Sequence, residues 1–66
     1  GMKVNRAGTL FATGPGGVYV FTPSGEHLGT IQSGAPISNC ALNEDESVLF
    51  MTSDAMILKI ELINQI

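Results

Sequence analysis

Cysteine and histidine are almost absent from this sequence, which has one of each, Cys40 and His27. A single cysteine excludes an internal disulfide bond. With His27 the only histidine and far from Cys40 in the sequence, no Cys/His cluster is available for a structural metal site. Disulfide bonds and a Cys/His metal site, which stabilise many small domains, are therefore excluded.

Positive charge is also scarce. Only 14% of the 66 residues are charged, with three Lys and Arg against six Asp and Glu, giving a net charge of −3. Proteins that bind nucleic acids gather basic side chains on one face, so no nucleic-acid partner is expected.

No apolar run approaches the roughly 20 residues that cross a bilayer. Lys3 and Arg6 are not followed by the continuous apolar stretch of a signal peptide, so no membrane partner is expected. One unpaired thiol is typical of a reducing compartment, and the sequence predicts a cytoplasmic location.

What the sequence does contain is a series of short apolar segments separated by turn residues. Val18 to Phe21 is a β-branched and aromatic run bounded by glycines and by Pro23, which is a strand signature. Similar patterns predict seven strands, at about 2–5, 9–13, 17–22, 27–32, 39–43, 48–52 and 56–62. Helical spacing also fits 56–65, but Lys59 and Glu61 on one side of an alternating pattern favour a strand there.

The chain also repeats itself. Val4 and Asn5 match Leu42 and Asn43 at an offset of 38, and an offset of 39 aligns Leu10, Phe11, Thr13, Val18 and Phe21 with Leu49, Phe50, Thr52, Ile57 and Ile60. A period near 40 residues with about four strands per unit is typical of propeller blades. The predicted fold is all-β, an antiparallel meander of about seven strands that makes roughly two blades of a β-propeller. Residues 1–66 form one partial propeller unit, with blade-like repeats at about 1–34 and 35–66.

Six ordered segments resemble the late blades of the gluconolactonase/regucalcin (senescence-marker-protein) family of six-bladed propellers. They are residues 1–5, 8–13, 16–18, 28–31, 39–41 and 48–52. The resemblance covers nearly the whole chain and implies a C-terminal fragment of such a propeller. It also implies that complete members hydrolyse sugar lactones or related esters with one divalent cation, Ca, Zn or Mn.

The resemblance further implies where that cation sits. A glutamate of the first blade, an asparagine of a middle blade and the aspartate of an Asp-Gly-Met motif hold it on the propeller axis. Gly1 and Met2 stand where the Gly-Met of this motif would be, so the aspartate would lie just before Gly1. The family commonly has Asp where Asn5 stands, and either residue can cap that turn. The resemblance therefore implies no catalytic residue, no metal ligand and no cofactor in the isolated chain.

Other polar motifs favour structural roles. Residues 44–46 lack the spaced ligands of an EF-hand, so a solvated acidic turn is favoured over a Ca²⁺ loop. Residues 14–17 lack the Gly-Lys-Ser/Thr ending of a phosphate loop and predict a hairpin turn. Cys40 is interpreted as a small buried strand residue rather than a nucleophile paired with His27.

Asn39 and Met2 are the candidate binding residues. Asn39 begins a predicted innermost strand after the loop at 33–36, a position that faces the central channel of a propeller. Met2 is taken as the equivalent position in the first repeat. Either residue could line a ligand site. For Asn39 the alternative is that it only caps the loop.

The favoured hypothesis is a gluconolactonase-like fragment that is inactive as an isolated chain. The alternatives are a small self-associating β-rich interaction module, or a metal-dependent lactonase whose site is rebuilt around Asn39 by oligomerisation. A 66-residue chain buries only roughly 60% of its unfolded surface, and open sheet edges need cover. The sequence therefore predicts a homo-oligomer, either a dimer or a propeller-like trimer.

Overall fold

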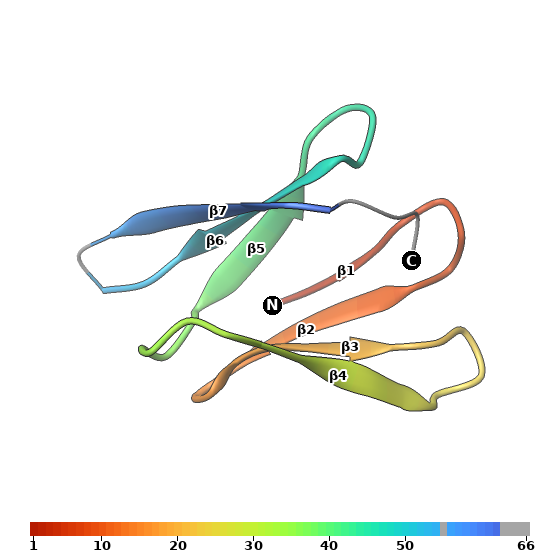
Figure 1. Ribbon diagram of the computed structural model, residues 1–66, viewed down its shortest axis with the longest axis horizontal. Coiled ribbons are helices and arrows are strands. Elements are labelled where there is room, and N and C mark those ends of the chain that lie inside the picture. Colours follow the sequence, from red (N-terminus) through yellow and green to blue (C-terminus); the bar gives the residue numbers. More distant parts are fainter. Residues whose placement is uncertain (55, 63–66) are drawn as a thin grey trace.

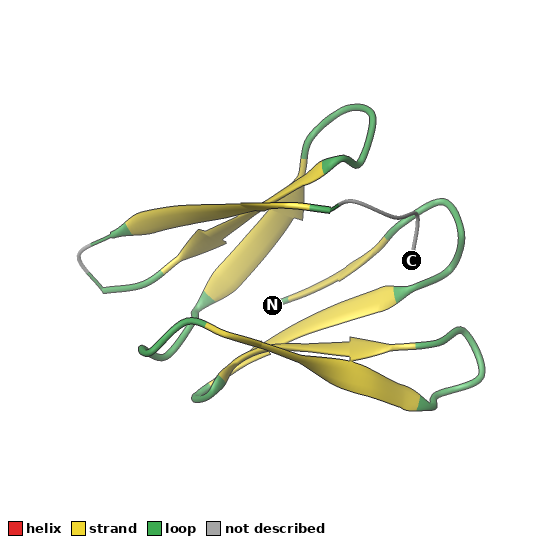
Figure 2. Ribbon diagram, viewed as in Figure 1, coloured by secondary structure: helices red, strands yellow, loops and turns green. Residues whose placement is uncertain are grey.

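The computed structural model describes residues 1–54 and 56–62, which form seven β-strands and no helix (Figure 2). The strands are β1 Met2–Val4, β2 Leu10–Gly14, β3 Gly17–Phe21, β4 His27–Gln32, β5 Asn39–Leu42, β6 Val48–Thr52 and β7 Ile57–Glu61. The all-β prediction is confirmed, and each boundary lies within one residue of the expected one. The last segment is a strand rather than the alternative helix, although residues 63–65 of that alternative lie outside the described residues. Within the described part of the chain, no helix could span a membrane.

The strands form two antiparallel sheets in simple sequence order. One sheet has the order β1-β2-β3-β4 and the other has the order β5-β6-β7. Figure 1 shows the two sheets lying one against the other, with the N-terminus near the space between them. The arrangement is consistent with two neighbouring propeller blades.

The internal repeat is reproduced in the strand pairing. Phe11 pairs with Lys3 and Val20 in the β1–β4 sheet, and Phe50 pairs with Ala41 and Lys59 in the β5–β7 sheet. These partners are related by the same offsets of 38 and 39 residues that align the sequence. The two sheets are therefore equivalent in register as well as in sequence.

The core lies between the sheets and uses opposite faces of the two repeats. The β1–β4 sheet contributes Phe11, Val18 and Val20, whereas the β5–β7 sheet contributes Cys40, Leu49 and Met51, and Ile37 of the connecting loop completes the cluster. Phe11 is fully buried, while its repeat equivalent Phe50 is 40% exposed. Among the described residues, each sheet thus contributes one of its two faces to the core.

The first turn of each repeat has the same design. The Oδ1 atoms of Asn5 and Asn43 accept hydrogen bonds from the backbone N–H groups of Thr9 and Val48, both at 2.9 Å. Gly8 supplies the positive φ that the first turn requires, and in the second turn Glu46 takes the equivalent position at φ 62°. The asparagine directly after β1 and the asparagine directly after β5 therefore fix the two turns.

Candidate functional site

Asn39 lies at the first position of β5, on the face of the sheet that points away from the core. Its Oδ1 accepts a hydrogen bond from the backbone N–H of Cys40 at 2.9 Å, and its backbone pairs with Thr52. The residue is exposed. Its carboxamide oxygen therefore already caps the start of the strand.

Hydroxyl groups surround this strand start. Ser38 Oγ lies 3.0 Å from Thr52 Oγ1, and Thr13 Oγ1 lies 3.4 Å from the carbonyl oxygen of Ser38 and 2.7 Å from the amino group of Gly1. We call Gly1, Thr13, Ser38, Asn39 and Thr52 the polar junction, because they join the two sheets at the starts of β1 and β5. The three hydroxyl residues were not predicted as site residues, although the match of Thr13 with Thr52 across the repeat points to two of them.

Met2 is not part of the polar junction, and its expected equivalence with Asn39 is wrong by one position. Thr13 donates its backbone N–H to the carbonyl of Gly1, as Thr52 pairs with Asn39, so Gly1 is the true equivalent of Asn39. Met2 instead corresponds to Cys40 and lies 66% exposed on the outer face of the β1–β4 sheet. The structure also places the Asn39 carboxamide beside the Cα of Gly1, whereas the Met2 side chain lies on the other face of β1.

A shallow depression lies beside Asn39 on the outer face of the β5–β7 sheet. Its volume is about 130 Å³, and it is lined by Asn39, Cys40, Ala41, Phe50 and Thr52. Sites for small molecules usually measure roughly 300–1,000 Å³. The depression is thus too small for a sugar lactone and is of the size that a single protruding side chain fills.

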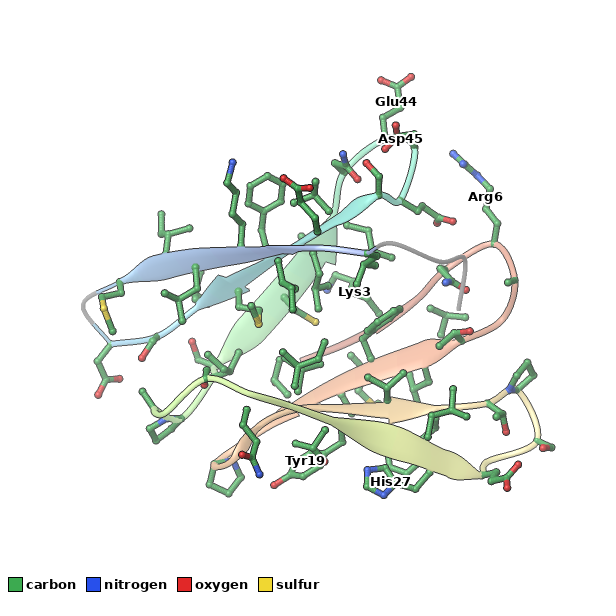
Figure 3. The ribbon with its side chains drawn as sticks, viewed as in Figure 1. Lys3, Arg6, Tyr19, His27, Glu44 and Asp45 are labelled. Atoms are coloured by element: carbon green, nitrogen blue, oxygen red, sulfur yellow. The ribbon has the colours of Figure 1, made fainter. Side chains whose placement is uncertain are left out.

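The acidic turn at 44–46 contacts the other repeat. The backbone N–H of Arg6 donates to both carboxylate oxygens of Glu46, at 3.0 and 3.2 Å, and the Arg6 guanidinium donates to the carbonyl oxygen of Glu44 at 2.9 Å. Figure 3 shows Arg6 extending toward the turn that carries Glu44 and Asp45. These groups lie at an open surface, and sequence analysis did not predict that they meet.

Within that turn, Asp45 accepts hydrogen bonds from Ser47. The Ser47 hydroxyl donates at 2.5 Å and its backbone N–H at 3.1 Å, and together they hold the pKa of the Asp45 carboxyl below its ordinary value. The carboxylate is thereby used to shape the turn.

Cys40 and His27 lie in different sheets. Cys40 is buried in the core, where burial raises the pKa of its thiol and the positive charge of Lys3 offsets part of the rise. His27 is exposed on the outer side of the β1–β4 sheet (Figure 3). The centre of its ring lies 5.2 Å from that of the Phe21 ring. A raised thiol pKa and the separation from His27 are the opposite of what a cysteine nucleophile needs.

The next feature is the set of side chains that could bind a metal ion. Among residues 1–54 and 56–62, no three His, Cys, Asp or Glu side chains gather where they could hold an ion. The polar junction offers neutral hydroxyl and amide groups, whereas a divalent cation site usually includes carboxylate or imidazole ligands. The described residues therefore do not fit a divalent cation by themselves.

The sequence was compared with known proteins. It is 40% identical over 62 residues to a gluconolactonase from Zymomonas mobilis subsp. mobilis, a match that covers 91% of this chain and 17% of that protein. No family model matches the sequence, and no solved structure matches it significantly. The resemblance predicted from the six ordered segments is confirmed.

Proposed function

We propose that this chain forms two adjacent blades of a gluconolactonase-like β-propeller, and that it supplies scaffold rather than catalytic groups to lactone hydrolysis. The observation that carries the proposal is the 40% identity over 62 residues, in a chain whose two sheets share one register. Adjacent blades of a propeller are repeated sheets that pack face against face, which is the relationship between these two sheets.

The chemistry of the chain supports a scaffold role. Among the described residues, the buried side chains are apolar apart from those of Asn5 and Thr9, which belong to the first turn. The side chains at the polar junction are three hydroxyls and one amide, and the nearest thiol is buried. We propose that the divalent cation of the family is held by residues of other blades, and that the isolated 66-residue chain does not hydrolyse lactones.

A chimera tests the scaffold role directly. The 62 aligned residues of the Zymomonas mobilis gluconolactonase are replaced by those of this chain, and hydrolysis of glucono-δ-lactone is measured. We expect a folded chimera whose kcat/KM stays within about tenfold of the parent, because the chemistry comes from the parent residues. A matched chimera carrying Leu49→Asp, which places a charge in the core, should lose the fold and the activity. A correctly expressed chimera that does not fold would contradict the proposal.

Asn39 can be assigned a role in the same chimera. If its exposed amide contacts substrate in the channel, Asn39→Ala raises KM while the melting temperature hardly changes. If it only caps β5, the melting temperature falls and KM is unchanged. The hydrogen bond to Cys40 leads us to expect the second result.

The second candidate function is a metal-dependent lactonase rebuilt by association of several copies around Asn39. The exposure of Asn39 is the observation that favours this function. The isolated chain is assayed with Ca²⁺, Zn²⁺ and Mn²⁺, and we expect no turnover. Metal-stimulated activity that Asn39→Ala abolishes would overturn the scaffold proposal in favour of this one.

A further inference from the structure

Two apolar areas are not covered by any residue in the described part of the chain, and they lie on opposite outer faces. The outer face of the β1–β4 sheet carries Met2 and Val4, which are 66% and 62% exposed. The outer face of the β5–β7 sheet carries Phe50 and Ile57, which are 40% and 78% exposed. We call them the Val4 face and the Phe50 face. Exposed apolar areas of this kind mark interaction surfaces.

The internal repeat indicates which surface each of the two faces would contact. The Phe50 face is the repeat equivalent of the inner face that carries Phe11, because both phenylalanines pair with residues at the same offsets. The Val4 face is the equivalent of the inner face that carries Leu42 and Cys40, since Met2 corresponds to Cys40 and Val4 to Leu42. Those two inner faces pack against each other in the core. The two free faces therefore repeat the two halves of an interface that the chain already forms within itself.

The shapes agree with this relationship. In the core, the Cys40 sulfur lies 3.9 Å from the carbonyl oxygen of Phe11. The equivalent contact between two copies would set Met2 of one copy near the backbone of Phe50 in the other. The depression of about 130 Å³ lies there, between Phe50, Ala41 and Asn39. Met2 projects with 66% of its surface exposed, and methionine adapts well to irregular apolar hollows.

We infer that two copies of this chain associate head to tail, with the Phe50 face of one copy packed against the Val4 face of the next. The contact is heterologous, because each copy uses a different face, and such contacts propagate into rings or chains of copies. This inference concerns the isolated 66-residue chain, whose two faces lack the neighbouring blades that the proposed function places against them, and it does not depend on lactone chemistry. Its evidence is the repeat and the exposed faces.

The test uses two variants that each damage one face. Phe50→Glu introduces a charge on the Phe50 face, opposite Lys59, which pairs with Phe50 and keeps the new carboxylate compatible with the sheet. Val4→Glu does the same on the Val4 face. We expect the wild-type chain to be larger than a monomer by light scattering and sedimentation. Each variant should be a folded monomer, with a dissociation constant at least about 30-fold higher.

Mixing the two variants gives the decisive result. The Phe50→Glu copy retains an intact Val4 face and the Val4→Glu copy retains an intact Phe50 face, so the mixture should form a one-to-one dimer and nothing larger. Circular dichroism of each variant establishes that it is folded. Met56→Glu is the matched control, because Met56 is 51% exposed but lies between β6 and β7 on neither face, and it should keep the wild-type size.

Three results would overturn the inference. A wild-type chain that stays monomeric at every concentration would show that the faces do not bind each other. If Phe50→Glu alone dissociates the oligomer, or Val4→Glu alone, the contact joins two identical faces. If both variants keep the wild-type size, association occurs elsewhere, for example through the edge strand β7.

Discussion

Glu46 caps the turn of a neighbouring sheet: its two carboxylate oxygens accept the backbone N–H of Arg6, forty residues away in the sequence. The first turn of one repeat is in this way fastened to the first turn of the other. Glu46 also holds a left-handed backbone, with φ 62°, at the position where the first turn has Gly8. The contact between the repeats thus depends on a glutamate in a left-handed conformation, which residues other than glycine adopt only at an energetic cost.

Replacing Glu46 with Gln is expected to destabilise the fold by about 0.5 kcal/mol, because a charge-assisted hydrogen bond becomes a neutral one at an exposed site. The loss should shrink at high salt. Urea denaturation of the wild type and the variant at two ionic strengths measures both effects.

Replacing Glu46 with Gln in an Arg6→Ala background identifies which group of Arg6 donates to Glu46. In the structure, the backbone N–H of Arg6 donates to the Glu46 carboxylate, and the Arg6 guanidinium donates to the carbonyl oxygen of Glu44. Because alanine retains the backbone N–H, we expect Glu46→Gln to cost the same in both backgrounds, within about 0.3 kcal/mol. A cost that disappears with the guanidinium would show that Glu46 pairs with the Arg6 side chain instead.

The stability contribution of Asp45 is expected to depend on pH. The hydrogen bonds from Ser47 hold the pKa of its carboxyl lower in the folded state than in the unfolded chain. Its contribution is therefore present above the unfolded pKa and is lost as the pH falls through the folded pKa. The free energy of unfolding of the wild type and of Asp45→Asn should converge on acidification. Asp54→Asn, which changes another exposed carboxylate, is the matched control. A difference in free energy of unfolding between the wild type and Asp45→Asn that stays constant with pH would disprove the effect.

The strands and turns were predictable because their signals are local. Strand runs end at glycine, proline and asparagine, and the offset of 39 residues aligns Phe11 with Phe50 regardless of tertiary structure. The buried face of each repeat was not predictable, because Leu10 beside Phe11 and Leu49 beside Phe50 make both faces apolar. Only the packing of the sheets buries Phe11 in one repeat and Leu49 in the other.

The candidate site was predicted only in part for the same reason. Asn39 follows a loop and begins a strand, which the sequence reveals. The Thr13 hydroxyl comes near it only because the two sheets meet there, where its Oγ1 lies 3.4 Å from the carbonyl oxygen of Ser38, the residue before Asn39. The contact between Arg6 and Glu46 also joins residues far apart in the chain, and no local pattern encodes it.

Gly17 is expected to be the glycine least tolerant of substitution. Its φ is 135°, and a Cβ at this position would collide with the backbone carbonyl oxygen of Ile31 in β4. Gly17→Ala should destabilise the chain by about 2 kcal/mol or more. Gly29→Ala in β4 is the control, since nothing lies within 4 Å of its Cβ position, and it should be neutral or stabilising by up to about 0.5 kcal/mol. Equal losses at the two positions, measured by urea denaturation, would contradict the strand geometry at Gly17.

The two equivalent phenylalanines should respond differently to the same substitution. Both are replaced by leucine in a Val4→Glu background, so that association does not contribute to stability. Phe11→Leu should cost about 1–2 kcal/mol because Phe11 is fully buried and the smaller side chain leaves a gap in the core. Phe50→Leu should change the free energy of unfolding by no more than about 0.5 kcal/mol, because that ring is 40% exposed. In the wild-type background, the difference between the two losses in free energy of unfolding should be smaller. Leucine at position 50 would then also weaken the contact between copies. Equal costs in the monomeric background would mean that the sheets pack through the opposite pair of faces, and both the core and the Phe50 face would have to be reassigned.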